Sequence, residues 1–251
     1  MSLASCTHGE GRPLVLLHGW GMNAGVWMSL LPRLRPQWRV TTIELPGHGE
    51  SDFVDGDIHA WARAVLAEAP PAATWLGWSL GAMVGLAAAA ASPERVEALV
   101  LAGGTPRFVR EPGWHCGMRP ELLQNFADEL FRTPQRTMLR FLGLQVRGAD
   151  NERETLKQLR SAVEQRPAAT EAALRKGLAL LLETDLRQLL AELAVPALWL
   201  YGEKDTLVSA KTADCVRELC PTAATEVIRG SGHAPFLSHP QHCLQALEAF
   251  A

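Results

Sequence analysis

Short apolar runs recur along the chain and alternate with longer stretches of helical character. Apolar runs without alternation are typical of strands buried on both faces, as in a parallel sheet. Six strands are predicted, at 14–17, 40–43, 73–76, 98–101, 197–201 and 224–228. The helical stretches between them supply the crossovers that parallel strands require. The pattern therefore predicts an α/β fold, with a mostly parallel central sheet and helices on both faces.

This alternation stops between residues 107 and 187, where no strand is predicted. Four helices are expected there instead, at 120–132, 134–146, 152–165 and 168–182. Thr133 followed by Pro134 is a typical helix start, with an N-cap and a proline in the first turn. We therefore expect residues 107–187 to form a helical cap, or lid, inserted after the fourth recognised strand. Residues 1–106 and 188–251 would form the core, whose sheet binds ligands at the carboxyl ends of its strands.

Composition narrows the classes of function. The chain has 251 residues, of which 47% are hydrophobic and 20% charged, and a net charge of −3, which does not favour nucleic-acid binding. The longest apolar run, Ala82 to Ala91, is too short to span a membrane, and no signal peptide is recognised at the N-terminus. We expect a cytoplasmic monomer.

The five cysteines form no C-x-x-C pair, and their odd number favours reduced thiols over a disulfide framework. Cys215 and Cys220 could be read as a metal pair, but no His or Cys partner motif lies nearby. No metal site is expected.

Candidate chemistry is concentrated at Gly77-Trp78-Ser79-Leu80-Gly81, which matches the G-x-S-x-G nucleophile elbow. The elbow places a serine on a strained turn between a strand and a helix, and its glycines leave room for that turn. The required context is present, because a predicted strand precedes Gly77 and an apolar helix is expected from Leu80 to Ala91. The pattern favours Ser79 as a nucleophile over a simple Gly-Ser turn.

A serine nucleophile needs a base and an orienting acid, which follow it in the order Ser, Asp or Glu, His in this kind of site. Asp205 comes after the fifth predicted strand and is the candidate acid, with Glu203 as its competitor. His233 lies between small residues after the sixth strand and is the candidate base. His239 is the rival, although its position before Pro240 favours a helix start.

An oxyanion hole needs two aligned backbone N–H groups. The residue after the nucleophile, Leu80, supplies one, and the loop after the first strand should supply the other from Trp20. His18 in the same loop is expected to brace it rather than to transfer protons. The Trp20 indole is interpreted as a pocket wall, with core packing as the alternative.

The cap differs in charge from the rest of the chain. Residues 107–187 contain 14 Lys and Arg against 11 Asp and Glu, a balance of +3, whereas the remainder has 10 against 16, or −6. Arg132, Arg136 and Arg140 recur every four residues, which predicts one helix face. Arg153, Lys157 and Arg160 follow at spacings of four and three residues, which predicts one face of the next helix. These residues form either a docking surface for an acidic partner or two solvated faces.

With these motifs the whole chain resembles the α/β-hydrolases with a helical cap. More narrowly, it resembles the pimeloyl-acyl-carrier-protein methyl ester carboxylesterases of biotin synthesis. The resemblance rests on residues 16–23 (LLHGWGMN) with Trp27, 44–51 (ELPGHGES), 77–81 (GWSLG) and 140–145 (RFLGLQ). Two departures are Ala82, where such enzymes often have a glycine, and the short chain before Leu14, which implies reduced opening strands.

The resemblance implies a serine esterase that removes methanol from a methyl-esterified dicarboxylic acyl chain carried by acyl carrier protein, with no cofactor. It implies that Arg136 and Arg140 meet the acidic carrier protein. It also implies a set of substrate-binding residues: Trp20, Ser79, Leu80, Phe141, Leu142, Gly143, Leu144, Gln145 and His233. The alternatives are a broad-specificity short-chain carboxylesterase, a carbon–carbon bond hydrolase on the same triad, and a non-catalytic ligand-binding protein of this fold.

Overall fold

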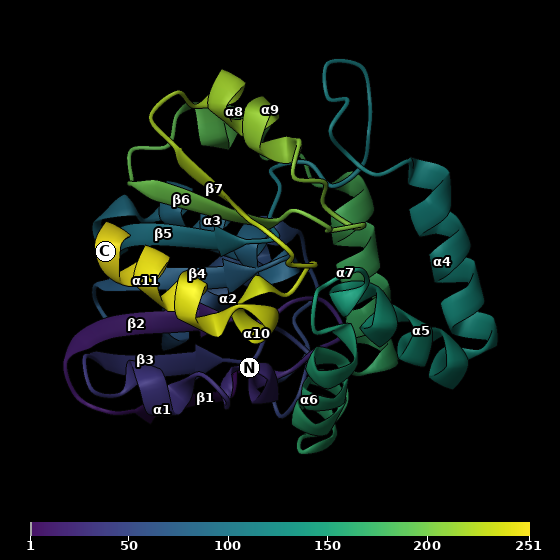
Figure 1. The fold of residues 1–251 in the computed structure, drawn as a ribbon, viewed down its shortest axis with the longest axis horizontal. Coiled ribbons are helices and arrows are strands. Elements are labelled where there is room, and N and C mark those ends of the chain that lie inside the picture. The colour runs from purple at the N-terminus through teal and green to yellow at the C-terminus, as the bar shows by residue number, and fades with distance from the viewer. Residues whose placement is uncertain (1) are drawn as a thin grey trace.

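A computed structural model describes residues 2–251 and contains one sheet of seven strands in the order β1-β3-β2-β4-β5-β6-β7 (Figure 1). The strands are β1 (Ser5–His8), β2 (Arg12–Leu17), β3 (Trp38–Ile43), β4 (Ala73–Trp78), β5 (Val96–Ala102), β6 (Ala197–Gly202) and β7 (Ala224–Ile228). Only β1 is antiparallel to its neighbour, β3, and all the other pairs are parallel. The predicted α/β fold with a mostly parallel sheet is confirmed.

Two apolar layers cover the sheet. Successive residues of β2 point to opposite faces, so that Leu14 and Leu16 belong to one buried cluster and Val15 and Leu17 to the other. The first cluster lies under η1 (Ala24–Trp27), α1 (Leu31–Leu34), α10 (Pro235–Ser238) and α11 (Pro240–Phe250). The second lies under α2 (Ile58–Glu68), α3 (Leu80–Ala91), α8 (Arg187–Ala191) and α9 (Thr212–Leu219). The short turn η2 (Pro93–Arg95) leads into β5.

The six predicted strands are all present, and a seventh, β1, was missed. β1 is short and its residues are mostly exposed, so it lacks the apolar run by which the others were recognised. β7 lies at the opposite edge and is only partly buried, whereas β4 and β6 in the middle of the sheet are buried throughout.

The cap consists of α4 (Pro120–Arg132), α5 (Pro134–Val146), α6 (Glu152–Glu164) and α7 (Glu171–Glu183), which lie beyond one end of the sheet (Figure 1). The ends of this insertion meet where the Leu186 N–H donates to Pro106 O (2.8 Å) and Arg107 forms a bridge with Asp185. The four predicted helices are confirmed. Thr133 precedes α5 as expected, but its side chain caps nothing and donates to Glu129 O at the end of α4 instead. None of the helices within residues 2–251 is long and apolar enough to cross a bilayer.

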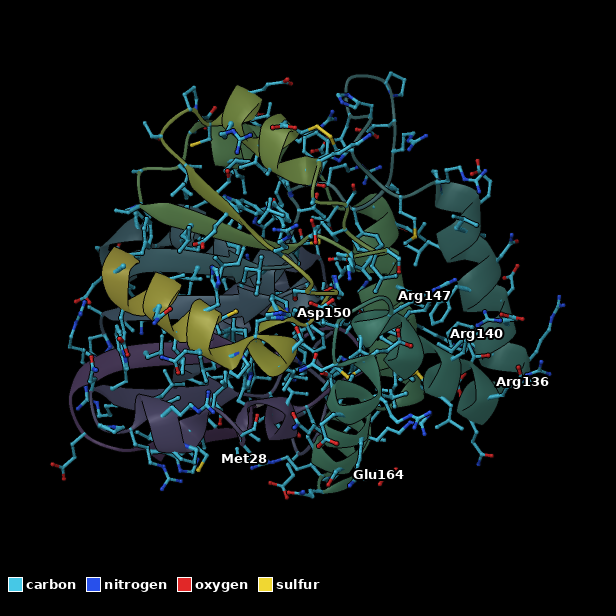
Figure 2. All side chains as sticks on the ribbon, in the orientation of Figure 1. Met28, Arg136, Arg140, Arg147, Asp150 and Glu164 are labelled. Carbon is cyan, nitrogen blue, oxygen red and sulfur yellow. A yellow bond between two sulfur atoms is a disulfide. The ribbon has the colours of Figure 1, made fainter. Side chains whose placement is uncertain are left out.

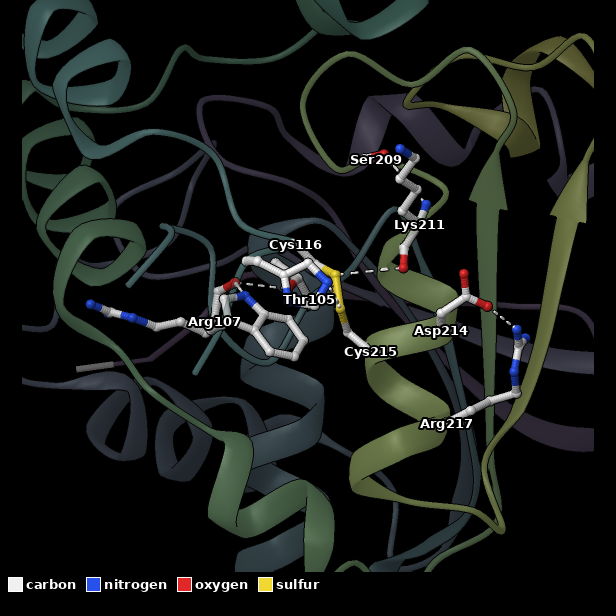
Figure 3. The surroundings of a disulfide bond; sticks show 10 residues. Thr105, Arg107, Cys116, Ser209, Lys211, Asp214, Cys215 and Arg217 are labelled. Carbon is white, nitrogen blue, oxygen red and sulfur yellow. Dashed lines mark hydrogen bonds and ion pairs between the residues drawn. A yellow bond between two sulfur atoms is a disulfide. The ribbon is translucent and has the colours of Figure 1, made fainter. Parts of the chain in front are cut away.

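A disulfide joins Cys116, in the segment before α4, to Cys215 on α9 (Figure 3). The expectation of five reduced thiols was therefore wrong for this pair, while Cys6, Cys220 and Cys243 are free. The partners are 99 residues apart in sequence, and only the docking of the cap's first segment on α9 brings them together. No local spacing could have shown the pairing.

Candidate functional site

Ser79 occupies a strained turn between β4 and α3. Its φ of 56° is the only positive φ of a non-glycine residue between residues 2 and 251. The turn requires its glycines, because a Cβ on Gly77 would lie 2.5 Å from Gly81 O and one on Gly81 would lie 2.5 Å from His18 O. The elbow therefore places the Ser79 hydroxyl at the carboxyl end of the central strand, with its backbone N–H donating to Ala102 O (3.0 Å).

His233 and Asp205 form a buried pair beside this turn. His233 Nδ1 lies 2.7 Å from Asp205 Oδ2, and His233 is 1% exposed. Asp205 Oδ1 accepts from the Leu207 and Val208 N–H groups at 2.8 and 3.0 Å, which fixes the carboxylate. A carboxylate on Nδ1 leaves Nε2 to face a substrate or nucleophile.

The competitors for these two roles lie elsewhere. Glu203 is exposed and accepts from the Gly230 N–H (2.9 Å) instead of meeting His233. His239 Nδ1 lies 2.9 Å from Ser238 Oγ, at the start of α11.

Contacts through Trp78 and Gly103 bring His233 to the elbow. The Trp78 indole N–H donates to His233 O (2.8 Å), and a Cβ on Gly103 would lie 3.0 Å from His233 Nδ1. Ser79 Oγ makes no hydrogen bond within residues 2–251, and the side-chain partner of His233 is Asp205. Hydrogen bonds between a nucleophile and its base are often long in unliganded enzymes.

Two backbone N–H groups near Ser79 lack a hydrogen-bond acceptor in the described part of the chain. Neither the Trp20 nor the Leu80 N–H donates a hydrogen bond to any of residues 2–251. Leu80 follows Ser79 at the start of α3, and a Cβ on Gly19, next to Trp20, would lie 3.3 Å from Ser79 Cβ. An oxyanion hole needs two unpaired donors close to the nucleophile, and these two N–H groups are the candidates.

Two buried histidines brace residues 18–25, which we call the oxyanion loop. His18 Nδ1 donates to Gly19 O (2.8 Å) and its Nε2 accepts from the Leu45 N–H (3.0 Å). His48 Nδ1 donates to Pro46 O (3.0 Å) and its Nε2 accepts from the Gly21 N–H (3.1 Å). Burial lowers the pKa of His18 to about 4 and that of His48 to about 3, so both rings are neutral near pH 7. Each ring thereby keeps one donor and one acceptor.

The second half of the cap is also fastened to this loop. We call residues 152–183, which contain α6 and α7, the inner half, and residues 120–147, which contain α4 and α5, the outer half. The Trp20 indole N–H donates to Leu174 O (3.0 Å), and Asn23 Nδ2 donates to Val163 O (2.9 Å). Arg166 pairs at 3.2 Å with the buried carboxylate of Glu44, which also accepts from the Ala24 and Glu50 N–H groups.

A cavity of about 340 Å³ opens at Ser79 between core and cap. Its buried lining is apolar and aromatic, and Trp20 meets Phe126 and Phe141 edge to face, with ring centroids 5.6 and 4.9 Å apart. The lining residues are Trp20, Ser79, Phe108, Met118, Leu122, Leu123, Phe126, Arg140, Phe141, Leu144, Arg147, Leu178, Leu181, Thr206 and Leu207. A volume and lining of this kind suit a small apolar acyl chain.

Only part of the expected acyl pocket borders this cavity. Phe141 and Leu144 line it with Trp20 and Ser79, whereas Leu80, Leu142, Gly143, Gln145 and His233 do not. Leu142 packs in the core, and Gln145 accepts at its backbone O from the Ala234 N–H (3.2 Å). The expectation placed all of residues 141–145 in the pocket, but they lie in a helix, where consecutive side chains point in different directions.

The walls from α4, α7 and residues 206–207 were missed by sequence reasoning. On α4 the spacing of Leu123, Phe126 and Leu130 gave a signal for an apolar face, but not for what that face covers.

The basic residues of the outer half lie on two helices. Arg132 ends α4, whereas Arg136 and Arg140 belong to α5, so the expected single face of three arginines was wrong. The four-residue spacing continues across a helix boundary at Thr133 and Pro134. Figure 2 shows Arg136, Arg140 and Arg147 following α5 from its outer end toward the core. Arg140 forms an ion pair with Glu129.

Metal-ligating side chains gather at one place in residues 2–251, where His115 lies beside Cys116 and Cys215. The two sulfurs are joined, so this cluster offers a metal only the imidazole. Cys215 belongs to α9, and none of the three residues lines the cavity at Ser79.

Comparisons with known proteins show the family of this chain. Residues 12–240 match the alpha/beta hydrolase fold family. A pimeloyl-acyl-carrier-protein methyl ester esterase of Photobacterium profundum is 43% identical over 100% of this chain and 99% of its own length. One of Methylococcus capsulatus is 42% identical over 100% of this chain and 98% of its own.

Solved structures show the same fold at lower identity. An esterase from Exiguobacterium antarcticum has a TM-score of 0.88 at 22% identity, covering 99% of this chain and 94% of that one. A hydrolase from Pseudomonas aeruginosa PA01 has a TM-score of 0.83 at 25% identity, covering 99% and 93%.

Proposed function

This chain belongs to the α/β hydrolase family and, within it, to the pimeloyl-acyl-carrier-protein methyl ester esterases, and we propose that it demethylates pimeloyl-acyl-carrier-protein methyl ester in biotin synthesis. It is a carboxylic ester hydrolase, and its products are pimeloyl-acyl-carrier protein and methanol. One observation carries the assignment to its site: the strained Ser79 elbow lies at an apolar cavity, and Trp78 of that elbow is hydrogen-bonded to His233 of the Asp205–His233 pair.

In the proposed acylation step, Ser79 Oγ attacks the ester carbonyl while His233 Nε2 takes the hydroxyl proton. Asp205 holds the imidazole in the required tautomer, and the Trp20 and Leu80 N–H groups stabilise the oxyanion. The bond between the carbonyl carbon and the methoxy oxygen then breaks. His233 returns the proton to that oxygen, and methanol leaves.

Water completes the cycle. His233 removes a proton from a water molecule, the resulting hydroxide attacks the acyl carbon, and the bond to Ser79 Oγ breaks as the serine regains its proton. These steps need only the side chains and N–H groups already named. The apolar walls around Phe141 and Leu178 favour binding of the methylene chain of the acyl group. They disfavour the carboxylate that hydrolysis leaves at the end of this chain.

We propose that the carrier protein docks on the outer half of the cap. Arg136 is exposed and has no carboxylate partner within residues 2–251, and Arg140 lies at the cavity itself. Arginines remain charged and donate bidentate bonds, which suits the acidic surface and phosphate of a carrier protein. The arginines would steer the partner toward the cavity from solvent, and we propose that the enzyme works in the cytoplasm as a monomer.

The test is hydrolysis of methyl-pimeloyl-acyl-carrier protein by the wild type, by Ser79→Ala and by a control, Ser29→Ala, at an exposed serine away from the cavity. Methanol release is measured together with labelling by a serine-directed phosphonate. Ser79→Ala should lower kcat by about 10⁶-fold and abolish labelling, while Ser29→Ala retains both.

Two results would contradict the proposal. Equal kcat/KM on carrier-bound and free methyl esters would assign a broad-specificity carboxylesterase instead. Absence of labelling and turnover in the wild type would assign a non-catalytic protein of this fold.

A further inference from the structure

The rim of the cavity differs chemically from its depth. Phe108, Leu123 and Leu178 are buried apolar walls. The exposed lining residues include Leu122, which is 47% exposed, and the two arginines Arg140 and Arg147. A substrate with its ester at Ser79 therefore leaves the cavity through a rim that carries positive charge.

Arg140, Phe141, Leu144 and Arg147 form the side of α5 that lines the cavity, with Arg147 as its C-terminal cap residue. The two arginines are seven residues apart, which is two helical turns or about 10 Å along the axis. Phe141 and Leu144 lie between them. The helix thus presents an apolar strip with a guanidinium at each end.

The two arginines differ in their partners. Arg140 is engaged by Glu129, whereas Arg147 pairs with no carboxylate in residues 2–251. The nearest acid in sequence, Asp150, pairs with Lys204 at 2.8 Å. Among the two arginines at this rim, Arg147 is therefore the one whose guanidinium has no side-chain partner within residues 2–251.

The backbone around Arg147 is held close to the catalytic loop. Gln145 O accepts from the Ala234 N–H (3.2 Å), and a Cβ on Gly232 would lie 3.3 Å from Arg147 O. This end of α5 is thus anchored on both sides of His233. The guanidinium consequently extends from a fixed point near the reacting ester.

We propose that Arg147 binds a carbonyl or carboxylate oxygen at the far end of the acyl chain and so selects dicarboxylic acyl chains over simple fatty acyl methyl esters. The inference rests on the proposed function and names a specificity-determining residue for it. A guanidinium stays charged and offers five donors, and its bond to an oxygen acceptor is stronger beside apolar walls. An alkyl end would displace water from those N–H donors without offering them an acceptor, which costs free energy. The same contact sets the orientation, because the neutral methyl ester enters the cavity while the polar end remains at the rim.

The test compares three methyl esters of one chain length: methyl heptanoate, monomethyl pimelate and methyl-pimeloyl-pantetheine. They end in an alkyl group, a carboxylate and a neutral thioester carbonyl. The enzymes are the wild type, Arg147→Met, Arg147→Lys and a control, Arg33→Met, at an exposed arginine of α1 outside the cavity. Thermal unfolding checks that each variant is folded.

Arg147→Met should reduce the preference for the two polar-ended esters over methyl heptanoate, as a ratio of kcat/KM, by about 10-fold, mainly through KM. Arg147→Lys should restore part of the preference for monomethyl pimelate, and the Arg33→Met control should match the wild type. Added salt should weaken the preference for monomethyl pimelate more than the preference for methyl-pimeloyl-pantetheine, because salt screens the attraction between two charges. The salt dependence therefore shows which end group is bound through its charge.

An unchanged ratio in Arg147→Met, or an equal loss on all three esters, would overturn the proposal. Wild-type turnover of methyl-pimeloyl-acyl-carrier protein is measured separately. Its absence would refute the proposed function even if Arg147 discriminates among free esters.

Discussion

The inner half of the cap is fastened to the oxyanion loop by specific polar contacts, whereas the outer half meets the core mainly through apolar walls and one end of α5. Arg166, Asn23 and Trp20 each make a direct bond between the inner half and the core next to the oxyanion donors. The outer half carries exposed arginines and lies farther from the sheet (Figure 1). We propose that this difference reflects a division of labour, in which the inner half supports catalysis and the outer half recognises the substrate's carrier.

Substitution of Asp205 tests the triad, on which the hydrolysis of every substrate depends. Asp205→Asn should lower kcat by about 10⁴-fold, because the amide favours the wrong imidazole tautomer. Since the change lies in the core, the loss should be equal for carrier-bound and small esters, as measured by steady-state kinetics. Greater damage by Glu203→Gln would show that the wrong carboxylate was chosen.

The disulfide offers a way to loosen the segment that leads into the outer half. Cys116→Ser with Cys215→Ser should lower the free energy of unfolding by about 3 kcal/mol under oxidising conditions, because the bond closes a long loop. Denaturant unfolding with and without reductant measures this effect. A reductant that destabilises the double variant as much as the wild type would mean that the bond contributes nothing.

Loss of Arg166 tests the attachment of the inner half. Arg166→Met leaves the buried Glu44 carboxylate with only backbone donors, so the free energy of unfolding should fall by about 2 kcal/mol. Because the oxyanion loop then loosens, kcat on p-nitrophenyl acetate should fall by about 10-fold.

Arg160→Met serves as the control for that experiment, since it removes an exposed arginine of the same half that forms no ion pair within residues 2–251. If both variants behave alike, the Glu44–Arg166 pair does not support the loop.

Much of the core could be predicted from sequence because its signals are local. The glycines around Ser79 follow from the strained turn, and α5 could be bounded by Thr133 and Pro134. The strand β1 lacked an apolar run and was missed.

The contacts that could not be predicted from sequence are those that form only when the cap packs against the core. Glu44 and Arg166 are 122 residues apart, and Cys116 and Cys215 are 99 apart. Neither pair has a local pattern, because each forms only where two separate segments pack together. The same applies to Arg147, whose place at the cavity follows from the contact of α5 with the His233 loop.

The most direct test of the division of labour removes the outer arginines and compares two substrates. In the double variant Arg136→Ala with Arg140→Ala, kcat/KM for the carrier-bound methyl ester should fall by about 10-fold at low salt and by less as salt rises. Hydrolysis of p-nitrophenyl acetate should stay within about twofold of the wild type, because Arg136 lies outside the cavity lining and Arg140, at the cavity rim, is hydrogen-bonded to Glu129 and not to the triad. The control, Arg33→Ala with Arg35→Ala, removes two exposed arginines from the opposite end of the molecule and should change neither rate. Equal losses on both substrates, or no loss on the carrier-bound ester, would contradict the account.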